Sequence, residues 1–114
     1  MKVYIAGPIT GVPDYRMIFE EAASFLETEM GYVALNPAIL PEGMDTEDYM
    51  AIGMAMLSRA DAIFLLHGWE NSGGAKVEKA YAEYNAKTVI YQELDLDWKE
   101  WEARETAANC EGEW

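Results

Sequence analysis

The residues best suited to chemistry are Ser72, Gly73 and Gly74, with Glu78 six positions after the serine. An apolar run of strand length, residues 61–66, precedes them, and a helical pattern follows the glycines. The serine is a good helix N-cap because its hydroxyl can accept from the free N–H groups of the first turn. Because the two glycines have no side chains, a ligand can approach the backbone of that turn closely. A strand, a glycine loop and a helix N-terminus together make a natural anion or ligand site.

Glu78 is the candidate catalytic residue, because its carboxylate would stand beside the glycine loop if its helix face points back toward that loop. The simpler alternative is a solvated helix glutamate. Against this alternative, Glu78 has no Lys or Arg four residues away, whereas Glu83 has both Lys79 and Lys87 at that spacing. A carboxylate without a helical ion-pair partner, close to a ligand loop, is a candidate for function.

The elements that must position these residues follow the order β-α-β-α-β-α-β. Apolar runs of strand length cover residues 2–6, 32–35, 61–66 and 88–91. Helical patterns lie between them, and Val77, Tyr81 and Tyr84 share one face of the third. Apolar strands joined by helices indicate a parallel sheet covered on both faces. We predict a three-layer α/β/α fold with a parallel sheet of four to five strands in the order 2-1-3-4, the simplest that right-handed crossovers allow.

This strand order places a topological switch point between the first and third strands, and ligands bind there at the carboxyl ends. Those ends carry residues 7–11 and 67–74, so two glycine loops should come together. The first loop lacks both the G-x-G-x-x-G spacing and a P-loop lysine, so it is not a dinucleotide or triphosphate fingerprint. It is either a plain turn or half of a ligand site. Tyr4 is expected in the core, with its hydroxyl reaching a partner at the rim.

Other reactive side chains are few. His67, the single histidine, is either a general base or a structural residue at a strand end. Cys110 lies in an acidic segment without basic neighbours that would activate a thiol. Ser72 stands in N-S-G-G rather than in the G-x-S-x-G of a nucleophile elbow. No His/Cys cluster has metal-ligand spacing, so we predict neither a metal nor a cofactor.

The composition limits the classes of partner. The 114 residues are a single-domain length, and they carry a formal net charge of −13 with a pI of about 4.2. Such a chain is unsuited to a nucleic-acid polymer, which needs a basic face, although a few N–H groups can hold a small nucleotide. A single cysteine fits a reducing compartment. We find no signal peptide or membrane span, and predict a cytoplasmic protein that binds no membrane.

The acidic residues concentrate after residue 92. Residues 93–114 hold eight acids against Lys99 and Arg104, which accounts for −6 of the −13. We predict one domain over residues 1–92 and an acidic C-terminal helix or tail, in which Trp98 and Trp101 pack on the domain or on a neighbouring subunit. The apolar share of 51%, with four Trp and seven Met, favours a homo-oligomer, a dimer or larger.

Four segments carry a resemblance to a known family: residues 4–11 (Y-I-A-G-P-I-T-G), Asn36-Pro37, Asp61, and residues 68–78. In these segments the chain resembles the nucleoside 2-deoxyribosyltransferase superfamily, and most nearly its small, largely uncharacterised branch in phages and bacteria. The resemblance covers roughly residues 2–91. It implies a flavodoxin-like sheet and cleavage of the N-glycosidic bond of deoxynucleosides or deoxynucleotides.

The resemblance also implies roles for individual residues. The glutamate that matches Glu78 attacks the anomeric carbon of deoxyribose, where a carboxylate can stabilise and trap a cationic transition state. The sugar then passes to another base in a transferase, or to water in a hydrolase. The serine that matches Ser72 holds a 5′-phosphate in the hydrolase relatives.

Two positions depart from the family's pattern. Gly53 stands where relatives carry an aspartate that helps to protonate the leaving base or to orient the sugar, and Thr10 stands where the nucleotide hydrolases carry an arginine. Asp48 and Asp45 are candidates to replace the missing acid. We expect a gap beside Gly53, weak or absent activity with intact binding, and a faster Gly53→Asp variant.

The first hypothesis is an enzyme that cleaves or transfers at the N-glycosidic bond of a deoxynucleoside or its monophosphate, with Glu78 as nucleophile. The second is a catalytically impaired nucleotide-binding module that kept the pocket, and the third is a structural or interaction protein. Trp69 is a candidate either to flank the base or to pack its loop against the domain. The predicted substrate-binding residues belong to the two glycine loops and their surroundings: Tyr4, Gly7, Pro8, Ile9, Thr10, Gly11, Asn36, Trp69, Ser72, Gly73 and Gly74.

Overall fold

The computed structural model describes residues 1–92, in which strands and helices alternate along the chain. In chain order the elements are β1 (Lys2–Ala6), α1 (Tyr15–Thr28), β2 (Val33–Leu35), the 3₁₀ helix η1 (Pro37–Ile39), α2 (Thr46–Ser58), β3 (Ala62–Leu65), the 3₁₀ helix η2 (Trp69–Asn71), α3 (Gly73–Tyr84) and β4 (Thr88–Tyr91). The predicted acidic helix with Trp98 and Trp101 lies outside the described residues. None of the helices within residues 1–92 combines the length and apolar character needed to cross a membrane.

The four strands form one parallel sheet in the order β2-β1-β3-β4. Tyr4 of β1 pairs with Leu35 of β2 on one side and with Ile63 of β3 on the other, and Ile63 pairs in turn with Val89 of β4. The predicted strand order and the three-layer, flavodoxin-like architecture are therefore confirmed. The two central strands, β1 and β3, flank the switch point.

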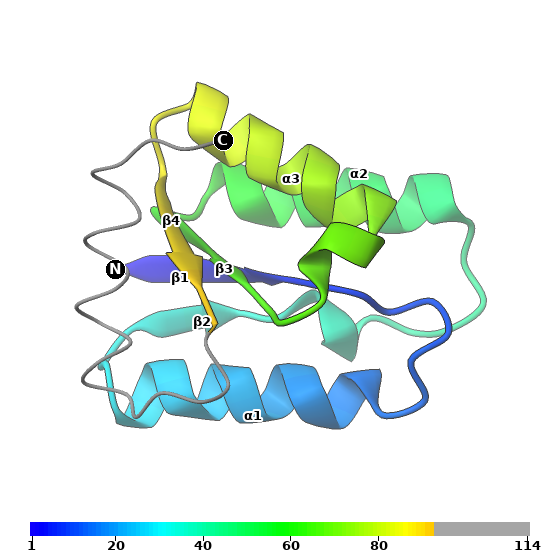
Figure 1. Cartoon of the computed structure of the whole chain (residues 1–114), viewed down its shortest axis with the longest axis horizontal. Coiled ribbons are helices and arrows are strands. Elements are labelled where there is room, and N and C mark those ends of the chain that lie inside the picture. Colours follow the sequence, from blue (N-terminus) through cyan, green and yellow to red (C-terminus); the bar gives the residue numbers. More distant parts are fainter. Residues whose placement is uncertain (93–114) are drawn as a thin grey trace.

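Helices cover both faces of the sheet. Figure 1 shows α1 on one side and α2 with α3 on the other. Alternate residues of β1 serve the two layers: Val3 and Ile5 belong to the core cluster under α1, whereas Tyr4 and Ala6 belong to the cluster under α2 and α3. Because successive strand residues point to opposite faces, Tyr4 is directed into the layer that α2 and α3 form.

Short-range signals begin and end the helices. The Ser72 Oγ accepts from the backbone N–H of Ala75 over 3.2 Å, so Ser72 is the predicted N-cap of α3. Asp45 is the N-cap of α2, and the Asp48 carboxylate accepts from the backbone N–H of Asp45 over 3.2 Å. Gly31 follows the end of α1 in a left-handed conformation with φ of 70°. A short connection that contains η2 leads from the carboxyl end of β3 to the first turn of α3.

The face of α3 predicted from Val77, Tyr81 and Tyr84 packs only in part, since Tyr81 is half-buried against the core under α2 and α3. Val77 is 52% exposed and Tyr84 is 91% exposed. The buried face consists of small or ionisable residues: Ala75, Glu78, Lys79 and Ala82. Ala75 and Ala82 are fully buried on that face, and Glu78 between them brings a carboxylate into the interior.

Candidate active site

A pocket with a volume of about 640 Å³ opens at the carboxyl ends of β1 and β3. Its walls come from the loop after β1, the segment after β2, the start of α2 and the N-terminus of α3. This is the switch-point position at which parallel α/β sheets bind ligands. The residues predicted from the sequence that line it are Tyr4, Gly7, Pro8, Ile9, Thr10, Ser72, Gly73, Gly74 and Glu78.

Tyr4 holds Glu78 in the wall of this pocket. The Tyr4 hydroxyl donates to Oε2 of Glu78 over 2.6 Å, across 74 positions of sequence. Tyr4 is 2% exposed and Glu78 is 7% exposed. The tyrosine comes from the central strand β1, and the glutamate comes from the second turn of α3. One carboxylate oxygen is therefore held against the middle of the sheet at the edge of the pocket.

The environment of this pair changes the acidity of both groups. Burial raises the pKa of the Glu78 carboxyl from its ordinary 4.5 to about 7, although the hydrogen bond from Tyr4 acts to lower it. Burial, and after it the charge of Glu78, raises the pKa of the Tyr4 phenol. Tyr4 therefore remains a donor while Glu78 changes between acid and carboxylate near neutrality. A carboxyl group of this kind can exchange a proton with a ligand or, when ionised, act as a nucleophile.

Gly53, in the middle of α2, lies against both polar atoms of the pair. A Cβ at position 53 would lie 2.7 Å from the Tyr4 hydroxyl and 2.8 Å from Oε2 of Glu78. Both distances are shorter than a van der Waals contact. The gap that we expected beside Gly53 is therefore absent, because the tyrosine hydroxyl and the glutamate carboxylate already occupy that space.

The N-terminus of α3 presents backbone to the pocket. A Cβ on Gly73 would meet nothing within 4 Å, whereas one on Gly74 would lie 3.1 Å from Sδ of Met50. The N–H groups of the first helical turn lack intrahelical acceptors and stand at the positive end of the helix dipole. Ser72 accepts from Ala75 through its Oγ and can still donate its hydroxyl proton. This corner can therefore receive an oxygen of a ligand.

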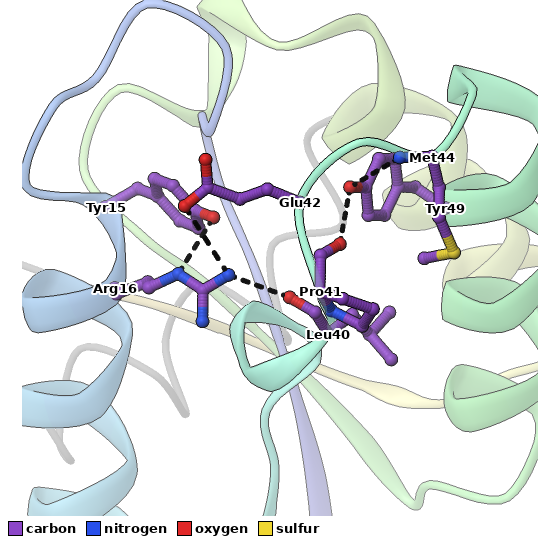
Figure 2. A network of polar contacts seen from close by, with 7 residues as sticks. All are labelled: Tyr15, Arg16, Leu40, Pro41, Glu42, Met44 and Tyr49. Atoms are coloured by element: carbon purple, nitrogen blue, oxygen red, sulfur yellow. Dashed lines mark hydrogen bonds and ion pairs between the residues drawn. The ribbon is translucent and has the colours of Figure 1, made fainter.

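A strap formed by residues 40–44 makes another wall of the pocket, to which Leu40, Glu42 and Met44 contribute. From α1, Nη2 of Arg16 donates to the carbonyl of Leu40 over 2.9 Å and lies 3.8 Å from Oε2 of Glu42. Figure 2 shows Arg16 beside the strap with these contacts drawn. One basic side chain thus joins the first helix to two strap residues.

The second helix fastens the other side of the strap. The Tyr49 hydroxyl donates to the carbonyl of Pro41 over 2.6 Å and accepts from the N–H of Met44 over 3.3 Å. In Figure 2, Tyr49 and Arg16 approach the strap from opposite sides. The strap is therefore held between α1 and α2 and shapes the pocket as part of a fixed scaffold.

The sequence analysis missed the contribution of the strap and the residues around it. The missed lining residues are Ile5, Ala6, Tyr15, Phe19, Pro37, Ala38, Leu40, Glu42, Met44, Thr46, Tyr49, Met50 and Asn71. One signal was present: the Pro-containing stretch follows β2, whose carboxyl end lies at the same sheet edge as those of β1 and β3. Asn36 was the single residue of this stretch that we predicted for the site, and the residues after it were not included.

The described lining of the pocket is acidic. Two carboxylates, Glu42 and Glu78, belong to it, and none of the lining residues within 1–92 is a lysine, arginine or histidine. In the same part of the chain, no three His, Cys, Asp or Glu residues gather in a way that could hold a metal ion. The polar groups offered to a ligand are therefore hydroxyls, backbone N–H groups and carboxylates.

Several sequence candidates lie outside the described pocket lining. Gly11 is an exposed residue with φ of 78° beyond the lining part of its loop. Asn36 caps η1, where its Oδ1 accepts from the N–H of Ala38 over 2.9 Å. His67 is exposed, and its backbone N–H donates to the side chain of Gln92 over 2.9 Å.

Trp69 also stands outside the pocket lining and packs with the core under α2 and α3. Its ring lies 6.1 Å from that of Tyr91, centroid to centroid. The Nζ of Lys79 lies 5.4 Å from the Trp69 ring centroid, and Lys79 forms an ion pair with Glu83 over 2.9 Å. Of the two roles considered for Trp69, packing of the loop against the domain is the one that these contacts provide.

The acids proposed to replace the missing aspartate are engaged elsewhere. Asp45 and Asp48 begin α2, where the Asp48 side chain accepts from the backbone of Asp45, and neither lines the pocket. Asp61 lies at the amino end of β3, where its carboxylate accepts from the N–H of Lys2 over 2.8 Å. That hydrogen bond is the first cause of a lowered Asp61 pKa. This aspartate belongs to the sheet edge opposite the pocket.

Fold and site together define a three-layer α/β protein with a ligand pocket at the switch point of its sheet and a buried carboxylate in the pocket wall. A family model described as a domain of unknown function, DUF4406, matches residues 1–91. The chain therefore belongs to the DUF4406 family. No curated protein and no solved structure matches it. The resemblance to the nucleoside 2-deoxyribosyltransferase superfamily stays a prediction, which the family match neither supports nor contradicts.

Proposed function

We propose that this protein cleaves or transfers at the N-glycosidic bond of a deoxynucleoside, with Glu78 as the nucleophile. The observation that carries this proposal is the buried Glu78 carboxylate, held by Tyr4 at 2.6 Å in the wall of the pocket. A carboxylate is the group that a cationic transition state at an anomeric carbon requires. A pocket of about 640 Å³ is in the size range of small-molecule sites.

The proposed reaction has two displacements at one carbon. The ionised Glu78 carboxylate forms a bond to the anomeric carbon while the bond from that carbon to the base nitrogen breaks. The electron pair of the broken bond leaves with the base, which takes a proton from solvent or a pocket acid. Water or a second base then forms a bond to the same carbon while the bond to Glu78 breaks, and the attacking group loses its proton to solvent. Tyr4 positions the carboxylate by donating to Oε2.

The charges of the pocket favour an uncharged nucleoside over its monophosphate. A phosphate would meet the carboxylates of Glu42 and Glu78, with no lysine, arginine or histidine among the described lining residues to offset them. The N-terminus of α3 attracts an anion only modestly. Ser72 and the adjacent N–H groups suit the neutral 5′-hydroxyl of a deoxyribose, which can both donate and accept.

One observation favours a second candidate, a nucleotide-binding module that kept the pocket and lost its chemistry. Gly53, Asp45 and Asp48 supply no acid to the pocket, because the first has no side chain and the other two begin α2. The second carboxylate of the lining, Glu42, is exposed and lies beside Arg16. Protonation of the leaving base would then depend on solvent, which lowers the expected rate.

Base release from a panel of deoxynucleosides and their monophosphates, followed by chromatography, separates the two candidates. We expect the wild-type protein to release free base and Glu78→Gln to release none while still binding nucleoside. Glu27→Gln, an exposed glutamate of α1, is the matched control and should keep the wild-type rate. Nucleoside-induced thermal stabilisation without base release would favour the binding module. Equal stabilisation by deoxyadenosine and adenosine would count against a deoxyribose-shaped site.

We also propose that the protein forms a homo-oligomer. Val77 and Tyr84, one face of α3, are 52% and 91% exposed in the single chain, and Ile39 is 74% exposed. Apolar side chains gathered on a helix face favour association. Light scattering should give a mass above the 12.8 kDa of one chain, and a monomer mass at all micromolar concentrations would contradict the proposal. The cytoplasmic location stays a prediction.

A further inference from the structure

Gly53 is unusual because nothing about its backbone requires glycine. It lies inside α2, and it is not among the glycines with positive φ, which are Gly11, Gly31, Gly43 and Gly68. Glycine is a poor helix former, since alanine at the same position loses less conformational entropy. The residue is also buried. A contact at this position, rather than the helix itself, must therefore favour the absence of a side chain.

That contact is with both ends of one hydrogen bond. A Cβ on residue 53 would lie 2.7 Å from the Tyr4 hydroxyl oxygen and 2.8 Å from Oε2 of Glu78, and these two atoms are themselves 2.6 Å apart. The backbone of α2 therefore touches the pair at the point where donor and acceptor meet. The third nearest atom, Cζ of Tyr4, is 3.8 Å away and would be an ordinary contact.

The two partners differ in how easily they can move. Tyr4 is part of a central strand with neighbours paired on both sides, and it is 2% exposed. The Glu78 carboxylate ends a flexible side chain on α3 and borders the pocket. An added methyl group at position 53 would therefore displace the carboxylate away from the tyrosine hydroxyl rather than move the strand.

We propose that Gly53 is a positioning residue, whose missing side chain lets the α2 backbone close over the Tyr4–Glu78 hydrogen bond and hold the carboxylate in place. The consequence for catalysis rests on the proposed function, in which Glu78 attacks an anomeric carbon. Displacement of a reacting group by about 1 Å costs on the order of 10²-fold in rate. A side chain at position 53 therefore harms the reaction, and the expectation that Gly53→Asp accelerates base release is reversed.

A double-mutant cycle between Gly53→Ala and Tyr4→Phe tests the proposal. Tyr4→Phe removes the hydroxyl oxygen, the nearer of the two atoms that a methyl group on residue 53 would meet, but keeps the ring. The Glu78 carboxylate, the other atom, can then move into the space that the hydroxyl oxygen leaves. We expect Gly53→Ala to lower the melting temperature on the order of 5 °C in the wild-type background, and to leave it unchanged or raise it in the Tyr4→Phe background. Equal shifts in both backgrounds would overturn the proposal.

Kinetics add a measurement that a purely structural role would not change. Gly53→Ala should lower kcat for base release on the order of 10²-fold with little change in KM, and should lower it much less in the Tyr4→Phe background. A kcat that Gly53→Ala leaves at the wild-type value would overturn the positioning role. Ala51→Gly, at an exposed position of the same helix, controls for changes in helix propensity.

The double-mutant cycle in melting temperature tests the positioning role of Gly53 separately from the proposed base release. If the wild-type protein releases no base from any nucleoside, the proposed function fails, and the coupling in melting temperature still decides whether Gly53 holds the pair. If Gly53→Ala does not fold but the double variant does, the clash with the hydroxyl is supported. If the double variant also fails to fold, removal of the Tyr4 hydroxyl does not relieve the clash, and the proposal is overturned.

Discussion

The Tyr4 hydroxyl donates to Oε2 of Glu78 over 2.6 Å and so joins the central strand of the sheet to the third helix. The two side chains are buried, and the carboxylate borders the pocket. A hydrogen bond to an ionised group in such surroundings is stronger than one between neutral groups. This single contact therefore bears on the pH dependence of the proposed reaction as well as on the stability of the fold.

The rate of base release should depend on the ionisation of Glu78. We expect kcat/KM to rise with pH and level off above about pH 7, because the carboxylate must be ionised to attack and its pKa is raised to about 7 by burial. Tyr4→Phe removes the hydrogen bond that lowers this pKa, so the midpoint should move above 7. Profiles of kcat/KM against pH for both proteins measure this. A Tyr4→Phe midpoint at or below the wild-type value would contradict the role given to the hydroxyl.

Stability should fall as the pH rises from about 4.5 to about 7, the ordinary and the folded pKa of Glu78. In this window the folded state holds a proton on Glu78 that the unfolded state has lost, so the free energy of unfolding decreases with pH. The shift from 4.5 to about 7 corresponds to roughly 3 kcal/mol in all. Glu78→Gln should remove most of this slope in urea unfolding, and Glu27→Gln should leave it intact. A slope that survives in Glu78→Gln would assign it to another group.

The strap at residues 40–44 should open more often when the hydrogen bonds that hold it are removed. Tyr49→Phe loses the hydrogen bonds to Pro41 and Met44, and we expect a loss of stability of about 1 kcal/mol. The backbone amide of Met44 should exchange its hydrogen faster, and nucleoside binding should weaken. Mass spectrometry of hydrogen exchange and calorimetry measure the two effects. Unchanged exchange at Met44 would show that the tyrosine does not hold the strap.

Arg16→Ala provides an independent test of the same wall. Its ion pair with Glu42 is exposed and 3.8 Å long, so we expect less than about 1 kcal/mol of lost stability. Nucleoside affinity should fall further than stability does, because the donation to the Leu40 carbonyl is also lost. Arg59→Ala, an exposed residue after α2, is the matched control. Equal effects of Arg16→Ala and Arg59→Ala on affinity would show that Arg16 does not support the pocket wall.

The acidic lining predicts a preference that one substitution should reverse. The wild-type protein should bind a deoxynucleoside more tightly than its 5′-monophosphate. Thr10→Arg places a cation in the exposed loop after β1, which lines the pocket, and should improve monophosphate binding by about 10-fold through a charge-assisted hydrogen bond. Thr10→Gln matches the change in size without the charge. Calorimetry that shows equal gains for nucleoside and monophosphate would contradict this interpretation.

Much of the fold could be predicted from the sequence because the signals that begin and end strands and helices are local. Apolar runs of strand length, the caps at Asp45 and Ser72, and the glycine at Gly31 act within a few residues of the elements that they begin or end. Right-handed parallel crossovers then left few strand orders, of which the simplest is the one observed. That order places the loop after β1 and the first glycines of α3 at one switch point, where both line the pocket.

Only the tertiary structure decided what surrounds Glu78. The sequence alone left Glu78 as either a solvated helix residue or a catalytic carboxylate beside the glycine loop, since its partner Tyr4 lies 74 positions away on another element. Position 53 shows the limit most clearly, because its sequence context suggested an empty space. The structure fills that space with the Tyr4 hydroxyl and the Glu78 carboxylate. Local patterns specify the strands, the helices and their caps. Contacts between side chains far apart in the sequence depend instead on how closely β1, α2 and α3 pack together.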